Sequence, residues 1–524
     1  MSLLEIQDLS VAIHGKSILK EVSLDIAQGE VCGVIGESGS GKSMTAFSVM
    51  QLLPHGATSS GAIHLDGIDM LRAGETQLCA MRGQTVGMVF QEPMTALNPV
   101  HTIGQQVAET VRIHTGVSRA EAYERAADAL ERCELPRDKF PLNRYPHELS
   151  GGQRQRVVIA MAIALRPKLL IADEPTTALD VTTQAEIIHL LRDLVNSDGM
   201  GLMLITHDLA VVTGVADKIV IMRNGEVVER AAARTFRQTM RHPYSKALFE
   251  ASSHQPERAG RADDTVILSV RDVVRDYPVA RASLFTKPGT FRAVDHVSFD
   301  IKRGECLGLV GESGCGKSTL TRAILGLDEV QGGEILLDGA SVHSEDAARR
   351  KMQVVFQDPF GSFNPRHKVE RLIAEPFFRL DRSATDDEIS GALTSVGLAP
   401  DDRYKFIHEF SGGQRQRIAI ARALVIRPEL IILDEAVSAL DVSVRAQILD
   451  LLADLSGTLG LTYLFVTHDL TVVKAIADRV MVMRAGQIVE QGNTTEVFEA
   501  PQHAYTRALI EAAPQLPPIE ASAS

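Results

Sequence analysis

The chain repeats itself, and this repeat limits the possible architecture more than any other feature of the sequence. Residues 36–43 read GESGSGKS, and residues 311–318 in the second half read GESGCGKS. The segments LSGGQRQR (149–156) and FSGGQRQR (410–417) form a second matching pair. One hydrophobic core rarely serves more than roughly 250–300 residues, and this chain has 524. The repeat therefore predicts two copies of one domain.

Domain boundaries follow from how the copies align. The offset between the two LSGGQRQR-type segments also relates three later pairs of residues, which are Asp173 and Asp434, His207 and His468, and Tyr244 and Tyr505. Between the two repeated segments the second half is shorter, so the length difference is confined to that stretch. The polar run SSHQPERAGRADD lacks apolar periodicity and is typical of a linker. We predict a first domain at 1–251, a linker at 252–264, a second domain at 265–515 and a loose tail at 516–524.

Composition excludes several classes of protein. Hydrophobic residues at 45% and charged residues at 23% are ordinary globular values, which argue against a disordered or collagen-like chain. No apolar run approaches the roughly 18–20 residues that span a bilayer, so we expect no membrane crossing. An N-terminus with Glu5 and Asp8 does not resemble a secretory signal. A net charge of −13 disfavours nucleic-acid binding, and five cysteines without metal-ligand spacing predict a reduced, cytosolic protein.

Each glycine-rich segment follows an apolar run and precedes a helical pattern, which predicts a strand, a loop and a helix. The glycines let backbone N–H groups turn toward a polyphosphate, which also meets the positive end of the helix. Lys42 and Lys317 supply a mobile cation for the β- and γ-phosphates, and Ser43 and Ser318 offer a hydroxyl to Mg²⁺. The predicted nucleotide-binding residues of the two loops are Gly36, Glu37, Ser38, Gly39, Ser40, Gly41, Lys42 and Ser43, and Gly311, Glu312, Ser313, Gly314, Cys315, Gly316, Lys317, Ser318 and Thr319.

Two apolar runs end in paired carboxylates, LLIADE (169–174) and LIILDE (430–435). Such runs predict strands buried on both faces of a mainly parallel sheet, whose carboxyl edge is where nucleotides bind. Asp173 and Asp434 would hold Mg²⁺ through water, and Glu174 and Glu435 could polarise the attacking water as general bases.

A histidine ends a later apolar run in each half. His207 and His468 both precede Asp-Leu, and both follow the carboxylate pair at the same spacing. A histidine at a strand end can hydrogen-bond both a γ-phosphate and its water. A lone histidine of this kind is more often structural, but its duplication in register favours a functional role.

The feature that separates this chain from other phosphate-loop proteins, such as kinases and helicases, is Ser-Gly-Gly-Gln ahead of a helix. Ser150 and Ser411 fit the N-cap position and leave a helix N-terminus aimed at an anion. With the glycine-rich loop, the carboxylate strand and the trailing histidine in this order, both halves resemble ATP-binding cassette (ABC) ATPase domains. The resemblance implies an α/β fold of two tandem P-loop domains. Each would have a mainly parallel RecA-like core, an antiparallel β subdomain and a helical signature subdomain.

The resemblance also implies that the cassettes dimerise within the chain, with each ATP between the loop of one and the signature of the other. The first site would take Ser411, Gly413 and Asp441 from the second half, and the second site would take Ser150, Gly152 and Asp180 from the first half. All signature residues expected at ATP are Ser150, Gly151, Gly152, Gln153, Ser411, Gly412, Gly413 and Gln414. The implied catalytic residues are Glu174, His207, Gln91, Glu435, His468 and Gln357. The implied Mg²⁺ ligands are Ser43, Gln91, Asp173, Ser318, Gln357 and Asp434.

Both sets of polar residues are complete, so we predict two hydrolytic sites. The aromatic residue that stacks on adenine is less clearly marked: His14 is the candidate in the first half, and Tyr277 or Phe291 in the second. Pro175 follows the first carboxylate pair, whereas Ala436 stands at the matching position of the second, and no polar catalytic group is lost by that change.

Shorter motifs narrow the family. The segments VFQEPMTALNP (89–99) and VVFQDPFGSFNP (354–365), with HPYSKAL (242–248) and HAYTRAL (503–509), are similar to those of dipeptide, oligopeptide and nickel importers. The resemblance implies the ATP-hydrolysing subunit of a bacterial importer of peptides or a related small solute. The implied partners are two transmembrane permease subunits and, through them, a solute-binding protein. The segments after Gln91 and Gln357 would contact the permeases, which places the chain peripherally on the cytoplasmic face of the inner membrane.

Other functions remain open. One alternative is an importer ATPase for nickel or another small solute. A soluble double-cassette protein acting on ribosomes or DNA is disfavoured because the linker holds neither a long charged arm nor zinc-binding cysteines. A purely regulatory scaffold is disfavoured by the intact Glu174 and Glu435.

The cysteines point away from one cofactor. Many single-cassette relatives hold an iron–sulfur cluster with cysteines near the C-terminal end, whereas no cysteine follows Cys315 here. We expect ATP and Mg²⁺ but no iron–sulfur cluster. Cys32, Cys79 and Cys306 are predicted to be small core residues.

Overall fold

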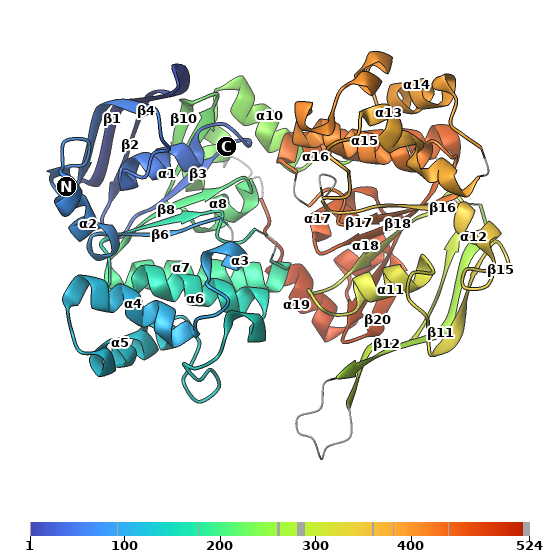
Figure 1. Ribbon diagram of the computed structural model, residues 1–524, viewed down its shortest axis with the longest axis horizontal. Helices are drawn as coiled ribbons and strands as arrows, with labels where there is room; N and C mark the ends of the chain where they lie inside the picture. Colours follow the sequence, from blue (N-terminus) through green and yellow to red (C-terminus); the bar gives the residue numbers. More distant parts are fainter. Residues whose placement is uncertain are drawn as a thin grey trace, which may run out of the picture. The chain divides into compact units, whose positions relative to one another are not determined.

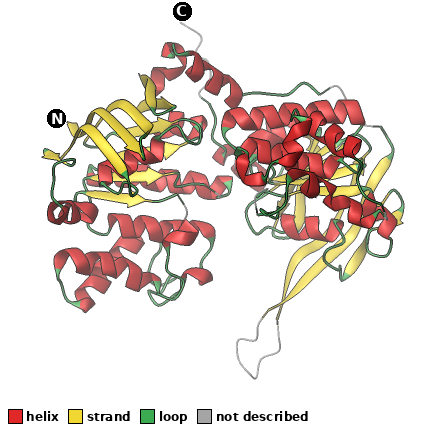
Figure 2. Ribbon diagram, turned by 45° about the horizontal axis from the view of Figure 1, so that its top comes forward, coloured by secondary structure: helices red, strands yellow, loops and turns green. Residues whose placement is uncertain are grey.

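The computed structural model describes residues 2–91, 93–177, 179–258, 263–279, 289–358, 361–380, 382–438 and 440–516. The chain forms two compact units, the first made mainly of Met1–Leu179 and Thr183–Ser252 and the second mainly of Ser253–Ala513. Each unit combines a four-stranded antiparallel sheet, a six-stranded and mostly parallel sheet, and helices (Figure 1, Figure 2). The predicted α/β fold is therefore confirmed for both halves. Residues 259–262 of the predicted linker and the predicted tail beyond Leu516 lie outside the described residues.

Two sheets organise the first unit. Its antiparallel sheet has the order β2-β1-β4-β5, with β1 at Ser2–Ile13, β2 at Lys16–Ala27, β4 at Ala57–Leu65 and β5 at Ile68–Asp69. The larger sheet has the order β10-β9-β3-β8-β7-β6, with β3 at Val31–Ile35, β6 at Val86–Val89, β7 at Leu169–Asp173, β8 at Gly201–Thr206, β9 at Lys218–Arg223 and β10 at Glu226–Ala232. Only the β9–β10 pair of this sheet is antiparallel.

The larger sheet is buried on both faces, as the apolar runs predicted. Along β7, Leu169 and Ile171 face a core shared with the antiparallel sheet and α1. The alternate residues Leu170 and Ala172 face a second core shared with the helices on the other side. Because strand side chains alternate in direction, a continuous apolar run can fill two cores at once.

The helices of the first unit lie around this sheet (Figure 2). They are α1 (Lys42–Met50), α2 (Glu75–Gln84), α3 (Pro93–Ala96), α4 (Ile103–Thr115), α5 (Arg119–Arg132), α6 (Gly151–Ile163), α7 (Val181–Asp198), α8 (Leu209–Val215), α9 (Phe236–Thr239) and α10 (Pro243–Ser252). Short 3₁₀ turns occur at η1 (Pro146–Glu148) and η2 (Ala233–Thr235).

The second unit repeats this plan. Its antiparallel sheet has the order β12-β11-β14-β15, with β11 at Val266–Val279, β12 at Gly289–Lys302, β14 at Gly332–Leu337 and β15 at Ala340–Ser341. The order of its larger sheet is β16-β17-β18-β13-β19-β20, with β13 at Cys306–Val310, β16 at Met352–Val355, β17 at Leu430–Asp434, β18 at Thr462–Thr467, β19 at Arg479–Arg484 and β20 at Gln487–Asn493. The strands β11 and β12 run as a long antiparallel ribbon (Figure 1).

The helices show where the length difference falls. Those of the second unit are α11 (Lys317–Ile324), α12 (Asp346–Arg350), α13 (Val369–Ala374), α14 (Asp386–Ser395), α15 (Gly412–Leu424), α16 (Val442–Leu459), α17 (Leu470–Ile476), α18 (Thr494–Glu499) and α19 (Ala504–Ala512), with 3₁₀ turns η3 (Glu375–Arg379), η4 (Pro400–Tyr404) and η5 (Ile407–Glu409). Helices α4 and α5 have 13 and 14 residues, whereas α13 and α14 have 6 and 10. The second unit therefore has shorter helices in the stretch before its signature segment, FSGGQRQR, while its sheets keep the same strand count.

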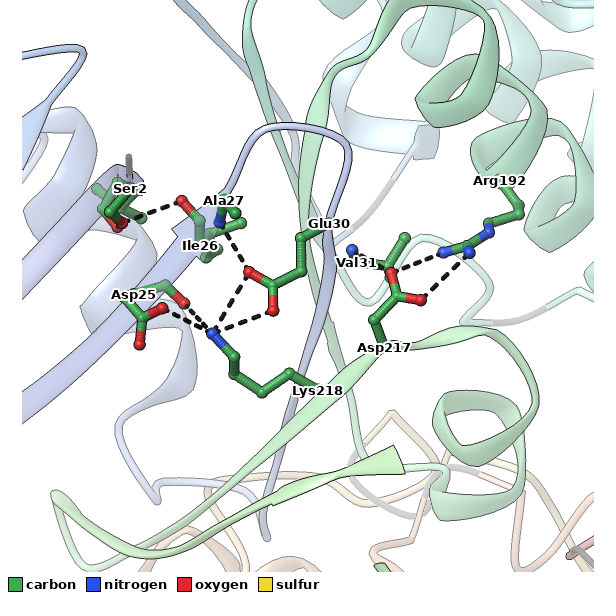
Figure 3. Close-up of polar contacts among 10 residues, drawn as sticks. Ser2, Asp25, Ile26, Ala27, Glu30, Val31, Arg192, Asp217 and Lys218 are labelled. Carbon is green, nitrogen blue, oxygen red and sulfur yellow. Dashed lines mark hydrogen bonds and ion pairs between the residues drawn. The ribbon is translucent and has the colours of Figure 1, made fainter. Parts of the chain in front are cut away.

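Ion pairs fix the amino edge of the larger sheet in the first unit (Figure 3). Lys218 donates to Asp25 Oδ2 at 2.8 Å and lies 3.1 Å from Glu30 Oε1. Next to them, Asp217 Oδ2 accepts from the backbone N–H of Val31 at 2.9 Å and from Arg192 at 3.0 Å. These contacts hold the start of β3, the strand that leads into the glycine-rich loop.

The predicted linker supplies the corresponding contact in the second unit. Asp478 Oδ2 accepts from the backbone N–H of Cys306 at 2.8 Å, and its guanidinium partner is Arg258. In sequence, Ala453 stands where the first half has Arg192. The Arg258 side chain is only 10% exposed and also donates to the Gly304 carbonyl and to Ser456 Oγ (3.2 Å). The predicted linker up to residue 258 is therefore fastened to the second unit through Arg258.

One cysteine prediction is wrong. Cys32 and Cys306 are fully buried in the cores, where burial raises the pKa of each thiol to about 12. Cys79, by contrast, is exposed on α2, one turn after Glu75, and its Sγ lies 3.4 Å from Glu75 Oε1. Its neighbours on the same helix, Leu78 and Met81, take the buried face instead. Among the described residues, no helix combines the length and apolar character of a bilayer span.

Replacing Arg258 with Ala should destabilise the second unit, since Asp478 and the Gly304 carbonyl both lose a charged donor. A loss of about 1–3 kcal/mol in the free energy of unfolding is expected. Urea unfolding followed by circular dichroism measures it, because the chain contains no Trp. Arg72 provides the control, since its side chain is 88% exposed and its pair with Asp69 is long, at 3.4 Å. An equal effect of R72A and R258A would contradict this role of the linker.

Candidate functional site

The parallel sheet brings the predicted residues of each unit to one edge. In the first unit the strands β3, β8, β7 and β6 are neighbours and run in the same direction. Their carboxyl ends lead to the glycine-rich loop, to His207, to Asp173 and Glu174, and to Gln91. The second unit repeats the order with β13, β18, β17 and β16. Four segments far apart in sequence thus converge because parallel strands end on the same side.

The glycine-rich loops have the geometry that a phosphate group requires. Gly41 and Gly316 cap α1 and α11 in the left-handed region, with φ of 105° and 112°. A Cβ at Gly316 would lie 2.3 Å from the Ala293 carbonyl oxygen, so no larger residue fits there. The Nζ of Lys42 donates to the carbonyl oxygens of Gly36 (2.7 Å) and Glu37 (2.9 Å). Lys317 makes the same two contacts with Gly311 and Glu312, at 2.6 Å and 2.9 Å.

The glutamates that follow β7 and β17 have an unusual backbone. Glu174 and Glu435 lie at φ of 48° and 51°, a region that non-glycine residues seldom occupy. Their N–H groups still donate to the neighbouring strand, to Ile205 O and Val466 O, both at 2.8 Å. The left-handed turn therefore comes immediately after the last sheet hydrogen bond. Strained positions of this kind cluster at functional sites.

Glu174 is surrounded by donors. His207 Nδ1 lies 3.4 Å from Oε1, while Gln91 Nε2 (3.0 Å) and Thr177 Oγ1 (2.9 Å) donate to Oε2. Burial alone would raise the pKa of Glu174, but His207 and Thr177 outweigh it and hold the value at about 2. Glu174 is thus ionised at neutral pH and already paired with His207, which, like His468, is predicted to bind the γ-phosphate and is called the switch histidine below.

The second unit keeps the histidine contact and changes the others. His468 Nδ1 lies 3.2 Å from Glu435 Oε1, while Gln357 Nε2 donates to Ser438 Oγ at 3.5 Å. Ser438 stands where the first unit has Thr177, and its hydroxyl donates to the Glu435 carbonyl oxygen at 2.9 Å. The pKa of Glu435 is lowered, because His468 outweighs the effect of burial. A cavity of about 540 Å³ is lined by Ser318, Gln357, Asp434 and Glu435, among others.

The aspartates differ from the glutamates beside them. Burial raises the pKa of Asp173 above its ordinary value. Burial, together with the adjacent Glu435, raises the pKa of Asp434 to about 6. Asp173 Oδ1 is buried and has no hydrogen-bond partner among the described residues. An orphaned buried carboxylate oxygen is costly unless a cation occupies the site, so these residues fit a divalent metal ion.

The signature serines occupy the predicted N-cap positions. Ser150 Oγ accepts from Gln153 N at 3.3 Å, and Gln153 Oε1 accepts from Ser150 N at 3.0 Å. Ser411 and Gln414 form the same reciprocal pair, at 3.4 Å and 3.0 Å. This is a capping box, so the two glutamines close the helix ends. This capping role was not among the predictions for Gln153 and Gln414, although the Ser-x-x-Gln spacing is a usable signal for it.

Comparison with known proteins shows the family of the chain. The profile of the ABC transporter family matches residues 19–177 and 294–438, more than half of the chain. The chain belongs to the ABC transporter family. A profile described as "Oligopeptide/dipeptide transporter, C-terminal region" matches residues 489–522. Each unit is therefore an ABC ATPase cassette.

Several proteins are similar over nearly the whole length. The peptidoglycan transport ATP-binding protein YejF of Agrobacterium fabrum is 45% identical and covers 99% of this chain and 98% of its own length. The glutathione import ATP-binding protein GsiA of Escherichia coli K12 is 42% identical and covers 99% and 90%. The solved ATP-binding cassette MJ0796 bound to ADP and Pi is 32% identical, covers 44% of this chain and 99% of its own, and has a TM-score of 0.40.

The helix that follows the carboxylate pair, α7 in the first cassette and α16 in the second, forms a different ion pair in each cassette. In the first, Glu186 on α7 pairs with Arg156 on the signature helix α6 at 2.8 Å. In the second, Arg445 on α16 pairs at 2.7 Å with Asp469, the residue that follows the switch histidine. Gln447 and Gln184 stand at the positions corresponding to Glu186 and Arg445. The predicted catalytic residues are thus duplicated, whereas these two ion pairs are not.

The candidates for adenine stacking are distinguished by their contacts. His14 lies in the turn between β1 and β2 at φ of 48°, and its N–H donates to Gly56 O at 3.2 Å. The hydroxyl of Tyr277 donates to Asp328 at 2.8 Å, and Arg275 lies over its ring. Phe291 faces Tyr277 across the β11–β12 ribbon and is 56% exposed. Phe291 therefore has the more accessible ring of the second-half pair.

Replacing Asp434 with Asn should stabilise the nucleotide-free protein at neutral and higher pH. The folded-state pKa of about 6 exceeds the ordinary value of 3.8, so ionising Asp434 costs stability in full above about pH 6, and this cost shrinks as the pH falls from 6 toward 3.8. The melting temperature of D434N should exceed that of the parent at about pH 8, and the gain should shrink by about pH 5. Thermal unfolding across this range measures it. Asp454→Asn, an exposed change on α16, should give no pH-dependent gain; a gain for D434N that does not vary with pH would contradict the prediction.

Proposed function

We propose that the chain is the ATP-hydrolysing subunit of an importer of peptides or peptide-like solutes, with two active ATP sites. The observation that carries the proposal is the convergence of the same lysine, carboxylate pair and histidine at one sheet edge in both cassettes. Similarity to proteins named for peptidoglycan transport and glutathione import supports the solute class, because both solutes contain short peptides. The oligopeptide/dipeptide transporter region at 489–522 supports it independently.

Phosphate binding would begin with the lysines. The ammonium of Lys42 rests on the carbonyl oxygens of Gly36 and Glu37, which leaves it buried and hydrogen-bonded before nucleotide arrives. Phosphate oxygens of ATP offer stronger, charged acceptors, so the lysine would exchange the carbonyls for them. Lys317 would do the same in the second cassette.

Ser43 and Asp173, and in the second cassette Ser318 and Asp434, would hold Mg²⁺, with Gln91 and Gln357 within reach. When bound, this ion neutralises phosphate charge as the γ-phosphate is attacked. The unpartnered Asp173 Oδ1 and the raised pKa of Asp434 both favour this assignment, because a cation would stabilise each of these buried carboxylates. Loading should therefore lower the pKa of Asp434.

Glu174 and Glu435 would orient and polarise the attacking water. Their left-handed backbone turns the carboxylate away from the strand, and His207 or His468 fixes one oxygen of it. The same histidine would bind the γ-phosphate once ATP is present. Gln91 already contacts Glu174, so it could place the water on the other carboxylate oxygen.

We also propose, from the family resemblance, that the signature of one cassette completes the ATP site of the other. Ser411, Gly413 and Asp441 would serve the first site, and Ser150, Gly152 and Asp180 the second. The capping boxes are compatible with this assignment, since they use the N–H groups of the serines and glutamines and not those of the glycines between them.

Single replacements Glu174→Gln and Glu435→Gln should each slow ATP turnover, by about 10²–10⁴ fold where the base limits the rate. The amide keeps the shape of the side chain but cannot accept a proton from water. Steady-state ATPase assays on the full chain measure this effect, and Glu131→Gln, an exposed change on α5, should leave the rate unchanged. An unaffected rate in either E174Q or E435Q would show that the two-site proposal is wrong.

The importer proposal requires membrane partners, because the chain itself shows no spanning helix in its described part. We propose two transmembrane permease subunits and, through them, a solute-binding protein, with the chain bound peripherally on the cytoplasmic face of the inner membrane. The segments after Gln91 and Gln357 would meet the permeases. Glu92 and residues 359–360 within them lie outside the described residues.

Affinity purification from detergent-solubilised membranes should recover the chain with two polytopic membrane proteins. Recovery with ribosomes or DNA instead would contradict the importer. Purification of the E174Q/E435Q double variant with ATP provides a matched test, because slow hydrolysis should prolong the ATP-bound complex. The solute-binding protein of the same system should bind short peptides in a calorimetric titration; binding of nickel alone would contradict the peptide-type solute.

A further inference from the structure

Each glycine-rich loop, called the phosphate loop below, is contacted by a tyrosine from a segment near the end of its cassette. These segments, HPYSKAL (242–248) and HAYTRAL (503–509), are called the late motifs. The hydroxyl oxygen of Tyr244, from HPYSKAL, accepts a hydrogen bond from the backbone N–H of Glu37 at 3.2 Å. Tyr505, from HAYTRAL, accepts from the N–H of Glu312 at 3.1 Å. Glu37 and Glu312 are the second residues of the two loops. The contact therefore recurs in both cassettes, between segments that lie far apart in the sequence.

A short chain of hydrogen bonds fixes the tyrosine of the second cassette. Glu490 on β20 accepts from the N–H groups of Gln502 (2.7 Å) and His503 (3.0 Å). His503 Nδ1 in turn accepts from Tyr505 N at 3.1 Å and caps α19. The first residues of the late motif thus set where the helix starts. The start of the helix then decides where the tyrosine points.

The first cassette repeats this chain. Glu229 on β10 accepts from the N–H groups of Arg241 and His242, and His242 Nδ1 accepts from Tyr244 N at 3.2 Å. The agreement in geometry between the two copies covers every step from the strand to the hydroxyl. A chance contact would not be expected to recur in this way at matching positions of both halves.

The tyrosine ring is enclosed as well as its hydroxyl. Tyr244 and Tyr505 are 7% and 6% exposed, and the guanidinium groups of Arg223 and Arg484 lie 4.7 Å and 4.8 Å from the ring centroids. These arginines end β9 and β19. A cation over an aromatic face contributes favourably to packing, so the ring is held on its face while the hydroxyl meets the loop.

The turn after each arginine touches the same loop further on. Gly225 N donates to Ser40 O at 3.0 Å, and Gly486 N donates to Cys315 O at 2.8 Å. The segment that follows the switch histidine thus contacts the phosphate loop at two points, near its start and near its tip. Lys42 binds the carbonyl of Glu37, whose N–H is held by Tyr244, so one residue of the loop is fixed on both sides.

We propose that Tyr244 and Tyr505 are positioning residues for ATP, which hold the phosphate loops in their binding shape through the N–H groups of Glu37 and Glu312. The inference rests on the proposed function, because it assumes that both loops bind ATP. When Lys42 leaves the Glu37 carbonyl for the phosphates, the tyrosine contact remains and the loop keeps its shape. Preorganisation of this kind raises affinity and leaves the chemical step unchanged. The late motif is thereby part of the nucleotide site.

The test removes only the hydroxyl. Tyr244→Phe and Tyr505→Phe, singly and together, keep the ring under its arginine. Loss of one neutral hydrogen bond should raise the KM for ATP by roughly 2- to 10-fold, with little change in kcat. ATPase assays over a range of ATP concentrations measure both parameters, and calorimetric titration of the full chain with ATP in the absence of Mg²⁺ measures binding without turnover.

Tyr463 offers a matched control. Its hydroxyl is buried in the core of the second cassette and donates to Leu452 O at 3.0 Å, away from the loop. Tyr463→Phe removes the same group from the same cassette, so it should lower thermal stability and leave the KM for ATP unchanged. An unchanged KM in both loop variants would overturn the inference. So would an equal KM rise in Y463F and Y505F, or a fall in kcat at constant KM.

Failure of the proposed function has a different signature. If the parent chain shows no ATP binding in the titration, the two ATP sites are wrong and the tyrosine role fails with them. If the parent binds ATP and Y244F and Y505F bind equally tightly, only the positioning role is wrong.

Discussion

Parallel pairing of four adjacent strands is the constraint on which the nucleotide site depends. In the first cassette β3, β8, β7 and β6 run the same way, so their carboxyl ends meet at one edge. This edge gathers a lysine, a carboxylate pair, a histidine and a glutamine that the sequence spreads from Lys42 to His207. Ion pairs at the opposite edge, around Glu30, Asp217 and Lys218, hold the strands in register (Figure 3). The chemistry at one edge thus depends on polar contacts at the other.

The two cassettes carry the same predicted catalytic residues, but different contacts hold these residues in place. Arg192 of the first cassette and Arg258 of the second hold equivalent aspartates, although one lies on a helix and the other in the chain that joins the halves. Glu174 has three side-chain partners where Glu435 has a histidine contact and a neighbouring serine. Such differences change pKa values and packing without removing any of the proposed catalytic residues. Equal composition of the two sites therefore does not require equal turnover.

Short sequence patterns correctly predicted the features that depend only on neighbouring residues, such as buried strands and helix caps. The apolar runs 169–173 and 430–434 are buried strands because a period of two fills both cores. Ser150 and Ser411 cap helices because a serine oxygen can reach a nearby N–H. The prediction that Cys79 is a core residue was wrong, because Leu78 and Met81 take the buried face of α2 and Cys79 lies on its exposed face. The contact of Tyr244 with Glu37 could not be predicted, since the two residues are far apart in the sequence and neither segment carries a local pattern that indicates the other as its partner.

The duplication and the α/β class can be read from motifs of a few neighbouring residues, and the same motifs predict which groups meet ATP. The partners of these groups follow from the tertiary structure. Only folding shows that Gln91 and His207 bind Glu174, that Arg258 belongs to the second cassette, and that the late tyrosines reach the phosphate loops. Distant contacts depend on strand order and on which helix faces pack. Strand order and helix packing are decided by the burial of the apolar surface of the whole domain, so no single segment of the sequence determines them.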